Sequence, residues 1–174
     1  MNIILIGYRG SGKTTVGRKL AARLGRSFVD CDDLIIAAAG KSIRDIFTQH
    51  GEDHFRDLES AAITKASGLT NHVIALGGGA LGRKANRTSI QGMASDVIYL
   101  SAVPAELLRR IEGDAQTSHN RPNLTSLGGG LQEITLLLRQ REPIYRAAMT
   151  HELDVTNLTP DQAVEEIAKL LKFH

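Results

Sequence analysis

The stretch Gly7-Tyr-Arg-Gly-Ser-Gly-Lys-Thr-Thr15 decides which fold the sequence can adopt. It follows the apolar run Asn2–Ile6 and precedes the helical pattern Val16–Leu24, so a strand, a glycine-rich loop and a helix come in direct succession. Its G-x-x-x-x-G-K-T spacing is typical of loops whose backbone N–H groups surround a polyphosphate at a helix N-terminus. A turn that only joins strand to helix is the alternative. The context favours phosphate binding, by Gly10, Ser11, Gly12, Lys13, Thr14 and Thr15.

Two side chains of this loop carry distinct expected chemistry. Lys13 would reach the β- and γ-phosphates as a point charge. The Thr14 hydroxyl would be a ligand of Mg²⁺, which prefers oxygen donors and keeps several waters. The loop therefore predicts a phosphate donor and its metal, but it does not identify the acceptor.

Outward from this loop, short β-branched runs alternate with helical patterns. This alternation predicts a parallel sheet with helices on both faces, that is, a three-layer α/β fold in one domain, residues 1–174. The last helix, Pro160–Lys172, has Thr159 as its expected N-cap. Five strands are expected, at Asn2–Ile6, Ser27–Asp30, His72–Leu76, Asp96–Leu100 and Glu152–Val155.

Composition limits the class of protein. A formal charge of +2 and the lack of a basic tract with interleaved aromatics make nucleic acid an unexpected partner. The single Cys31 cannot form an internal disulfide, and the first apolar run has no basic leader before it and ends in glycine. We therefore expect a cytoplasmic protein without a membrane segment.

The acceptor should lie where the later strands end, because open α/β sheets bind ligands there. The second expected strand runs into Asp30-Cys-Asp-Asp33. If the extended conformation persists to Asp32, Asp30 and Asp32 share one side of the strand, where one carboxylate would hold a water of the metal shell and the other would take a hydroxyl proton. The alternative is that Asp32 or Asp33 caps the helix expected at Leu34–Ala39.

Two further segments carry candidate acceptor groups. Arg56 lies on a helix whose apolar face comprises Phe55, Leu58 and Ala62, and it points elsewhere; alternatively, it forms a solvated ion pair with Glu52 four residues before it. The triplet Gly77–Gly79 follows a strand and allows the backbone to approach a bound molecule closely, although turn formation alone would also explain it.

The segment between Arg110 and Gly130 is polar, glycine-bearing and without apolar periodicity. It exceeds ordinary loop length, which is typical of lids and of disordered segments. We interpret residues 113–130, approximately, as a mobile lid that carries Arg121 over the phosphates. Arg141 alone suggests a structural role, a cation at the end of a helix.

Together these motifs resemble the shikimate kinase family over nearly the whole chain. The matching residues are Gly7–Thr15, Val29–Ile35, Gly40, Ile43, Ile46-Phe47, Gly51-Glu52, Phe55-Arg56, Glu59, Gly77–Ala80, Arg121-Pro122 and Arg141-x-Pro143-x-Tyr145. The resemblance implies a P-loop kinase fold and transfer of a phosphoryl group from ATP to the 3-hydroxyl of shikimate. It also implies a cytoplasmic enzyme of aromatic amino acid biosynthesis, expected to be a monomer.

Residue roles follow from the same resemblance. Lys13, Asp32 and Arg121 would be catalytic, and Arg121 would also bind ATP. Thr14 and Asp30 would serve the Mg²⁺ ion. The residues implied for shikimate binding are Asp32, Arg56, Gly78 and Arg141. The sequence departs from the family pattern in a longer segment before Arg121 and in Leu158, where many relatives have a basic residue near the adenine.

Two other functions stay open at this point. Another small P-loop kinase, for gluconate or a nucleoside monophosphate, would share the loop and a lid but would not require Asp32, Arg56 and Arg141. A silent nucleotide-binding regulator should have lost Lys13, Asp32 or Arg121, and all three are present. Arg9 is left undecided between solvent and nucleotide, Cys31 is expected to be buried and inert, and the histidines show no metal-ligand spacing.

Overall fold

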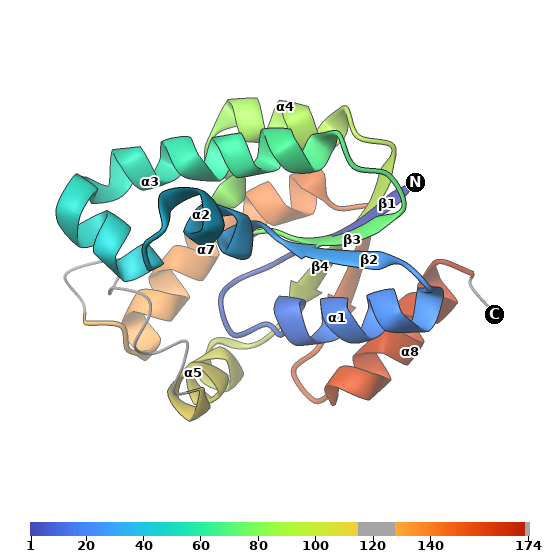
Figure 1. Ribbon diagram of the computed structural model, residues 1–174. Helices are drawn as coiled ribbons and strands as arrows, with labels where there is room; N and C mark the ends of the chain where they lie inside the picture. Colours follow the sequence, from blue (N-terminus) through green and yellow to red (C-terminus); the bar gives the residue numbers. More distant parts are fainter. Residues whose placement is uncertain (115–127, 173–174) are drawn as a thin grey trace.

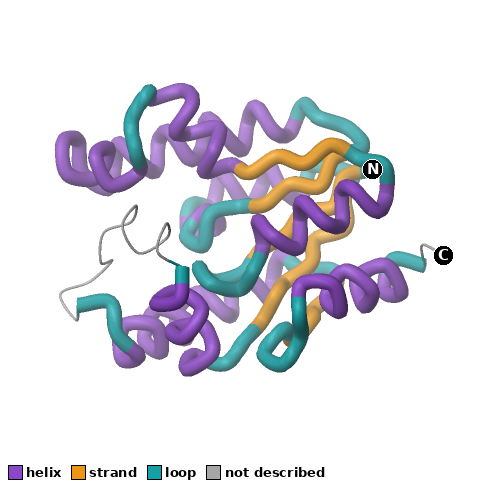
Figure 2. Tube along the Cα trace, turned by 60° about the horizontal axis from the view of Figure 1, so that its bottom comes forward, coloured by secondary structure: helices purple, strands orange, loops and turns teal. Residues whose placement is uncertain are grey.

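The computed structural model describes residues 1–114 and 128–172, and these contain one five-stranded sheet (Figures 1 and 2). The strand order is β2-β3-β1-β4-β5, and every neighbouring pair is parallel. The predicted parallel α/β sheet is therefore confirmed. The strands are β1 (Asn2–Ile6), β2 (Ser27–Asp30), β3 (His72–Ala75), β4 (Ser95–Ser101) and β5 (His151–Asp154).

Helices cover both faces of the sheet, with α1 and α8 on one face and α2, α3 and α4 on the other (Figure 1). The described helices are α1 (Lys13–Leu24), α2 (Cys31–Ala39), α3 (Ile43–Ser67, bent at Gly51), the 3-10 turn η1 (Ala80–Gly82), α4 (Lys84–Gln91), α5 (Pro104–Gly113), α7 (Leu131–Ala148) and α8 (Pro160–Leu170).

The central strand explains why two core clusters form. All five residues of β1 are buried. Because successive side chains of a strand point to opposite faces, Ile3 and Leu5 join the cluster under α1 and α8, while Ile4 and Ile6 join the cluster under α2 and α3. A continuous apolar run is what a strand needs when helices cover both of its faces.

Several predicted element boundaries differ from those of the structure, although the strand predicted at Ser27–Asp30 is confirmed. The condition that the extended conformation persists to Asp32 is not met, because α2 begins at Cys31 and not at Leu34. Strands β3, β4 and β5 differ from the prediction by one residue at one or both ends. The last helix ends at Leu170, although Thr159 caps it as predicted, in a capping box with Gln162. Arg141 does not close its helix, because α7 continues through Pro143 to Ala148. No helix among residues 1–114 and 128–172 is long and apolar enough to cross a membrane.

Candidate active site

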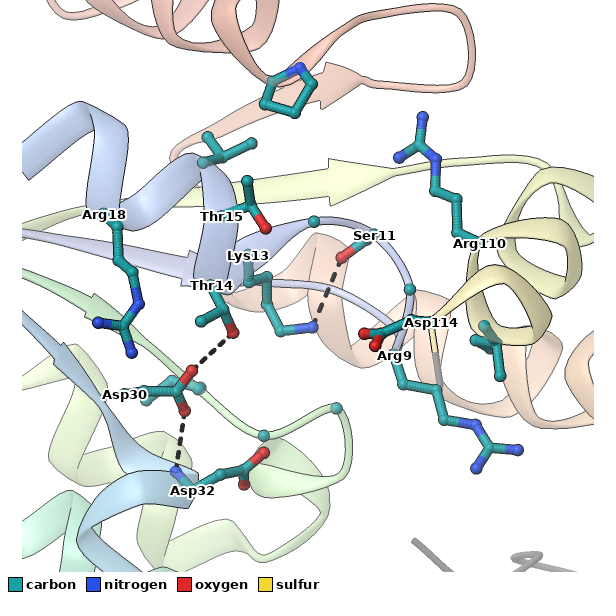
Figure 3. Close-up of a pocket in the computed structure, with 18 of the residues that line it drawn as sticks. Arg9, Ser11, Lys13, Thr14, Thr15, Arg18, Asp30, Asp32, Arg110 and Asp114 are labelled. Atoms are coloured by element: carbon teal, nitrogen blue, oxygen red, sulfur yellow. Dashed lines mark hydrogen bonds between the residues drawn. The ribbon is translucent and has the colours of Figure 1, made fainter. Parts of the chain in front are cut away.

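The phosphate-binding loop lies at the carboxyl edge of the sheet, where β1 has β3 on one side and β4 on the other. The connection after β1 leads to β2 on one side and the connection after β3 leads to β4 on the other, and open α/β sheets bind ligands at such a reversal of strand order. A cavity of about 1470 Å³ opens at this edge. The loop residues Arg9–Thr15, the carboxylates of Asp30 and Asp32, and the segment 155–160 all line it (Figure 3).

Glycines give this loop its shape. Gly7 has a φ of 145° and Gly12 a φ of 89°, values that residues with a side chain rarely adopt. A Cβ atom at Gly7 would also stand 2.6 Å from the carbonyl oxygen of Leu100. Helix α1 then begins at Lys13, and no side chain of the described residues caps it. Its first N–H groups and the positive end of its dipole therefore face the cavity.

Lys13 and Thr14 lie where the loop pattern predicts. The Lys13 ammonium donates to the carbonyl oxygens of Gly7 and Tyr8, each at 2.9 Å, and so lies across the mouth of its own loop. The Thr14 hydroxyl donates to Asp30 Oδ2 at 2.7 Å. Strand β2 thus brings a carboxylate to the helix that follows the loop, although the two residues come from different elements.

The oxygens of Thr14 and Asp30 suit Mg²⁺ in kind and in number. Magnesium is usually held by one or two protein oxygens together with substrate phosphates and waters. Both Asp30 oxygens already accept hydrogen bonds, Oδ2 from Thr14 and Oδ1 from the Asp32 amide at 3.0 Å (Figure 3). This arrangement fits a carboxylate that holds a water of the metal shell. No cluster of three or more His, Cys, Asp or Glu side chains suited to a metal occurs in the part of the chain that the structure describes.

The capping alternative for Asp32 and Asp33 is wrong. Asp30 is the N-cap of α2, because its backbone is extended and its side chain accepts from the Asp32 amide. Asp32 lies in the first helical turn and lines both the large cavity and the acceptor pocket described next. Asp33 lies at the rim of the large cavity, where its exposed side chain pairs with Arg18.

A second, narrower pocket adjoins the large cavity. It is lined by residues of the loop, of α2, α3 and α7, and of the turn after β3, among them Arg9, Asp32, Phe55, Arg56, Gly78 and Arg141. Sequence segments far apart thus contribute three guanidinium groups and one aspartate to a single small space, which we call the acceptor pocket. Planar guanidinium groups match a carboxylate in a bidentate manner.

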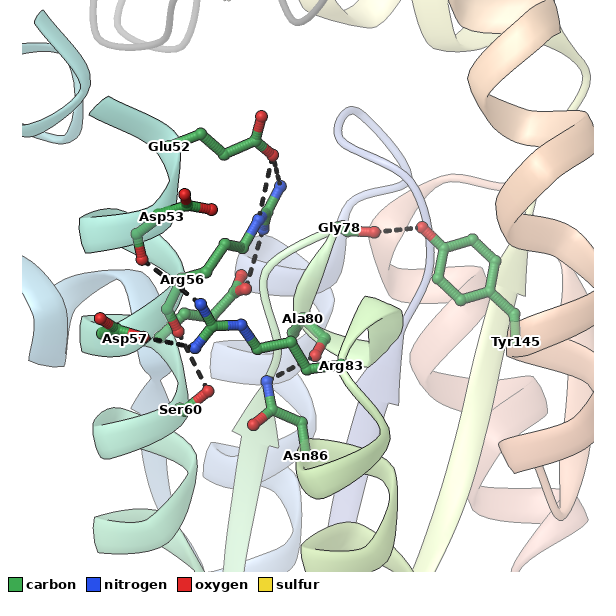
Figure 4. Close-up of polar contacts among 11 residues, drawn as sticks. Glu52, Asp53, Arg56, Asp57, Ser60, Gly78, Ala80, Arg83, Asn86 and Tyr145 are labelled. Atoms are coloured by element: carbon green, nitrogen blue, oxygen red, sulfur yellow. Dashed lines mark hydrogen bonds and ion pairs between the residues drawn. The ribbon is translucent and has the colours of Figure 1, made fainter.

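Arg56 is not a solvated surface residue. It pairs with Glu52 at 3.0 Å, as the i,i+4 spacing predicts, but also with Glu59 at 2.8 Å (Figure 4). Its side chain is 15% exposed and that of Glu59 only 2%. Burial lowers the pKa of Arg56, yet the two carboxylates outweigh this and raise the pKa overall. Arg56 therefore stays charged beside the acceptor pocket.

Arg141 approaches the same pocket from α7. Its guanidinium carbon lies 5.5 Å from the centre of the Tyr8 ring, a cation–π distance. One turn further along α7, the buried Tyr145 hydroxyl donates to the Gly78 carbonyl oxygen at 2.5 Å (Figure 4). Helix α7 thus contacts both the phosphate-binding loop and the turn after β3.

Side chains in the Gly77–Gly79 turn would collide with neighbouring atoms. None of the three has a positive φ. A Cβ atom at Gly79 would stand 2.5 Å from Arg56 Nη1, and one at Gly77 would stand 2.9 Å from Glu59 Oε1. The alternative of an ordinary turn therefore does not account for all three glycines. Their absent side chains let Arg56 and Glu59 approach the backbone.

Sequence reasoning missed two arginines. Of the two alternatives for Arg9, exposure to solvent is wrong, because Arg9 is only 9% exposed; it lines both cavities and reaches the fully buried Glu133 at 3.4 Å. Arg110 lines the large cavity and donates to the Val155 carbonyl oxygen at 2.6 Å, which fixes the loop that Leu158 belongs to. Only the spatial partners, 124 and 45 positions away, reveal these roles.

Two remaining expectations have different outcomes. The prediction that Cys31 is buried is confirmed, and burial together with Asp30 and Glu59 raises the pKa of its thiol to about 12, which disfavours the reactive thiolate. Arg121 and most of the expected lid at 113–130 lie outside the described residues.

Comparisons with known proteins agree with this geometry. The shikimate kinase family model matches residues 9–172. A shikimate kinase of Rhodopirellula baltica is 40% identical over 168 residues, which span 97% of this chain and 89% of that protein. One of Caldanaerobacter subterraneus is 41% identical over 168 residues, 97% of this chain and 94% of that protein. The solved shikimate kinase from Acinetobacter baumannii in complex with shikimate has a TM-score of 0.90 at 33% identity, and the match covers 98% of this chain and 92% of that chain.

Proposed function

The chain belongs to the shikimate kinase family, and on that premise we propose that it transfers the γ-phosphoryl group of ATP to the 3-hydroxyl of shikimate. The observation that carries this proposal is that two cavities adjoin each other. A phosphate-binding loop opens into one cavity, and an acceptor pocket with Arg56, Arg141 and Asp32 adjoins it. Asp32 lines both, so it stands between donor and acceptor.

On the donor side, Gly10, Ser11, Gly12 and Thr15 hold the phosphates with Lys13, the proposed catalytic cation. Phosphoryl transfer is catalysed mainly by positioning and by charge stabilisation, and a lysine in this loop supplies both. Thr14 and Asp30 would hold Mg²⁺, which would neutralise phosphate charge when bound. Arg121 is proposed to bind ATP and to assist catalysis from a lid at about 113–130.

On the acceptor side, Arg56 and Arg141 would bind the shikimate carboxylate. Two cations at one end of a ring fix its orientation, and the hydroxyl at the other end is then aimed at the donor. The Gly78 backbone would contact the ring. Asp32 would accept a hydrogen bond from the reacting hydroxyl and take its proton as the new O–P bond forms. We further propose a cytoplasmic monomer in which residues 1–174 are one domain.

The experiment is ADP release, coupled to an optical assay, with shikimate, gluconate or AMP as acceptor. We expect shikimate alone to stimulate the rate well above the ATPase background, because only its carboxylate and ring match a pocket with paired arginines. Stimulation by gluconate or AMP in place of shikimate would favour another small-molecule kinase. No stimulation by any of them, together with tight ATP binding, would favour a regulator.

A further inference from the structure

Arg9 is a charged side chain inside the phosphate-binding loop, yet it points away from Lys13 (Figure 3). Its guanidinium reaches Glu133 in the first turn of α7 at 3.4 Å. The Glu133 side chain is fully buried, and the Arg9 side chain is 9% exposed. The roles proposed above use neither residue.

A contribution to folding stability alone does not explain why this buried ion pair is present. Removing two charges from water costs several kcal/mol per ion, and apolar residues of similar volume often serve stability equally well. A buried ion pair does, however, fix the two elements that carry it in one relative position, because either charge alone in the interior is costly. The pair therefore holds the phosphate-binding loop and the first turn of α7 in one relative position.

The two elements that Arg9 and Glu133 join also meet at a second point. Tyr8 precedes Arg9 and lies beneath the Arg141 guanidinium, 5.5 Å from ring centre to guanidinium carbon. Glu133 and Arg141 are eight residues apart on α7, which is roughly 12 Å along the helix axis and about 80° around it. Consecutive loop residues thus contact α7 at two separated points, and Tyr145 ties the same helix to Gly78.

We propose that Arg9 and Glu133 are a positioning pair for the acceptor pocket. By fixing the first turn of α7 on the phosphate-binding loop, they set where Arg141 stands relative to the phosphates. A displaced Arg141 would hold the acceptor in the wrong orientation, and small misplacements of this kind can cost up to about a hundredfold in rate. This inference rests on the proposed function for its kinetic consequence, but not for the pair itself.

The kinetic test uses Arg9→Met, Glu133→Gln and the double variant. Each single variant should raise the KM for shikimate on the order of tenfold, with the KM for ATP within about twofold of wild type, because only the acceptor arginine is displaced. The double variant should lose less than the two single losses combined, since both changes remove the Arg9–Glu133 pair. Arg9→Lys should recover most of the loss. Arg23→Met, which breaks a surface pair with Glu165, is the matched control and should change neither KM.

Three results would overturn the proposal. If Arg9→Met raises the KM for shikimate and Glu133→Gln does not, Arg9 acts on the ligand directly. If both KM values rise together, the pair only holds the loop. If the melting temperature falls while both KM values stay unchanged, its role is structural.

A measurement without substrate separates this inference from the proposed function. Hydrogen exchange of the α7 amides at residues 134–137 should be faster in Arg9→Met and in Glu133→Gln than in wild type or Arg23→Met, because the first turn of α7 loses its anchor. Unchanged exchange would overturn the inference even in an active enzyme. Conversely, a wild-type protein without shikimate-dependent ADP release would refute the function while faster exchange in the variants still supports the pair.

Discussion

One change in backbone conformation gives Asp30 and Asp32, two residues apart in the sequence, different positions. The chain leaves the extended conformation after Asp30, so Asp30 becomes the N-cap of α2 and the hydrogen-bond acceptor of Thr14. Asp32, in the first helical turn, is directed to the space between the two cavities. These positions support the donor-side role proposed for Asp30 and the acceptor-side role proposed for Asp32.

Replacing Asp32 by Asn should separate binding from turnover. We expect Asp32→Asn to bind ATP as wild type does and to lose kcat by about a hundredfold or more, because the amide cannot take the hydroxyl proton. Nucleotide binding by calorimetry and kcat from ADP release measure the two effects. Asp33→Asn, at the exposed neighbouring carboxylate, is the control and should keep near-normal turnover. Near-normal turnover in Asp32→Asn as well would exclude Asp32 from the chemistry.

The buried Glu59 gives stability a predictable pH dependence. Burial raises the pKa of its carboxyl, and Arg56 partly offsets this increase. Between the unfolded and the folded pKa the native protein binds more protons than the unfolded chain, so stability falls as the pH rises. Arg56→Ala removes the cation that partly offsets the rise in the pKa of Glu59. The pKa of Glu59 should therefore rise further, and the stability lost with rising pH should become larger.

The measurement is the melting temperature from about pH 4.5 to about pH 7 for Arg56→Ala and for Arg56→Ala/Glu59→Gln. We expect the single variant to lose stability with rising pH relative to the double variant, and the double variant to be more stable at neutral pH by about 1 kcal/mol or more. Parallel curves for the two proteins would show that Glu59 does not titrate as its burial requires.

At the scale of elements, the turn between β3 and η1 positions the acceptor arginine. Gly79 has a φ of −102°, a conformation open to any residue. Its constraint is the Arg56 guanidinium, which would lie 2.5 Å from an added Cβ atom. The turn and the arginine of α3 therefore fit each other, and a methyl group at this point displaces the end of a flexible side chain and leaves the backbone in place.

Gly79→Ala should consequently impair shikimate binding and leave the fold intact. We expect a rise of about tenfold or more in the KM for shikimate, because the displaced guanidinium loses a charged hydrogen bond to the acceptor. The KM for ATP and the melting temperature should stay close to wild type. Gly82→Ala, at the end of η1 with nothing within 4 Å of the new Cβ atom, is the control and should change none of these values. A similar loss in both variants would contradict the account.

Element boundaries were the weakest part of the sequence-based prediction, for local reasons. The helix after β2 starts three residues before the expected Leu34, because Asp30 is the cap and the polar residues that follow it occupy the first turn. Helix α7 passes through Pro143, and its tertiary contacts through Tyr145 outweigh the hydrogen bond that proline cannot make. Neither result follows from propensity alone.

At the scale of the whole molecule, the sequence predicted the parallel sheet and the loop but not the convergence of distant side chains. The pattern of expected strands does not determine the order of the strands in the sheet. It also does not determine which helix packs against the phosphate-binding loop. The partners of Arg9 and Arg110 lie far along the chain. In the sequence alone, Glu59 and Glu133 resemble ordinary charged surface residues, although both side chains are buried. The roles proposed for Arg56 and Arg141 came from the family resemblance, and the structure places both at one pocket.

The most direct test of the central claim compares shikimate with its methyl ester as acceptors of the wild-type protein at saturating ATP and Mg²⁺. Paired arginines that hold a carboxylate should make kcat/KM for the ester lower by about a hundredfold or more, because charged hydrogen bonds to two guanidinium groups are lost. We expect strong shikimate-dependent ADP release and this large difference. Equal values for acid and ester, or no stimulation by shikimate above the ATPase background, would contradict the account.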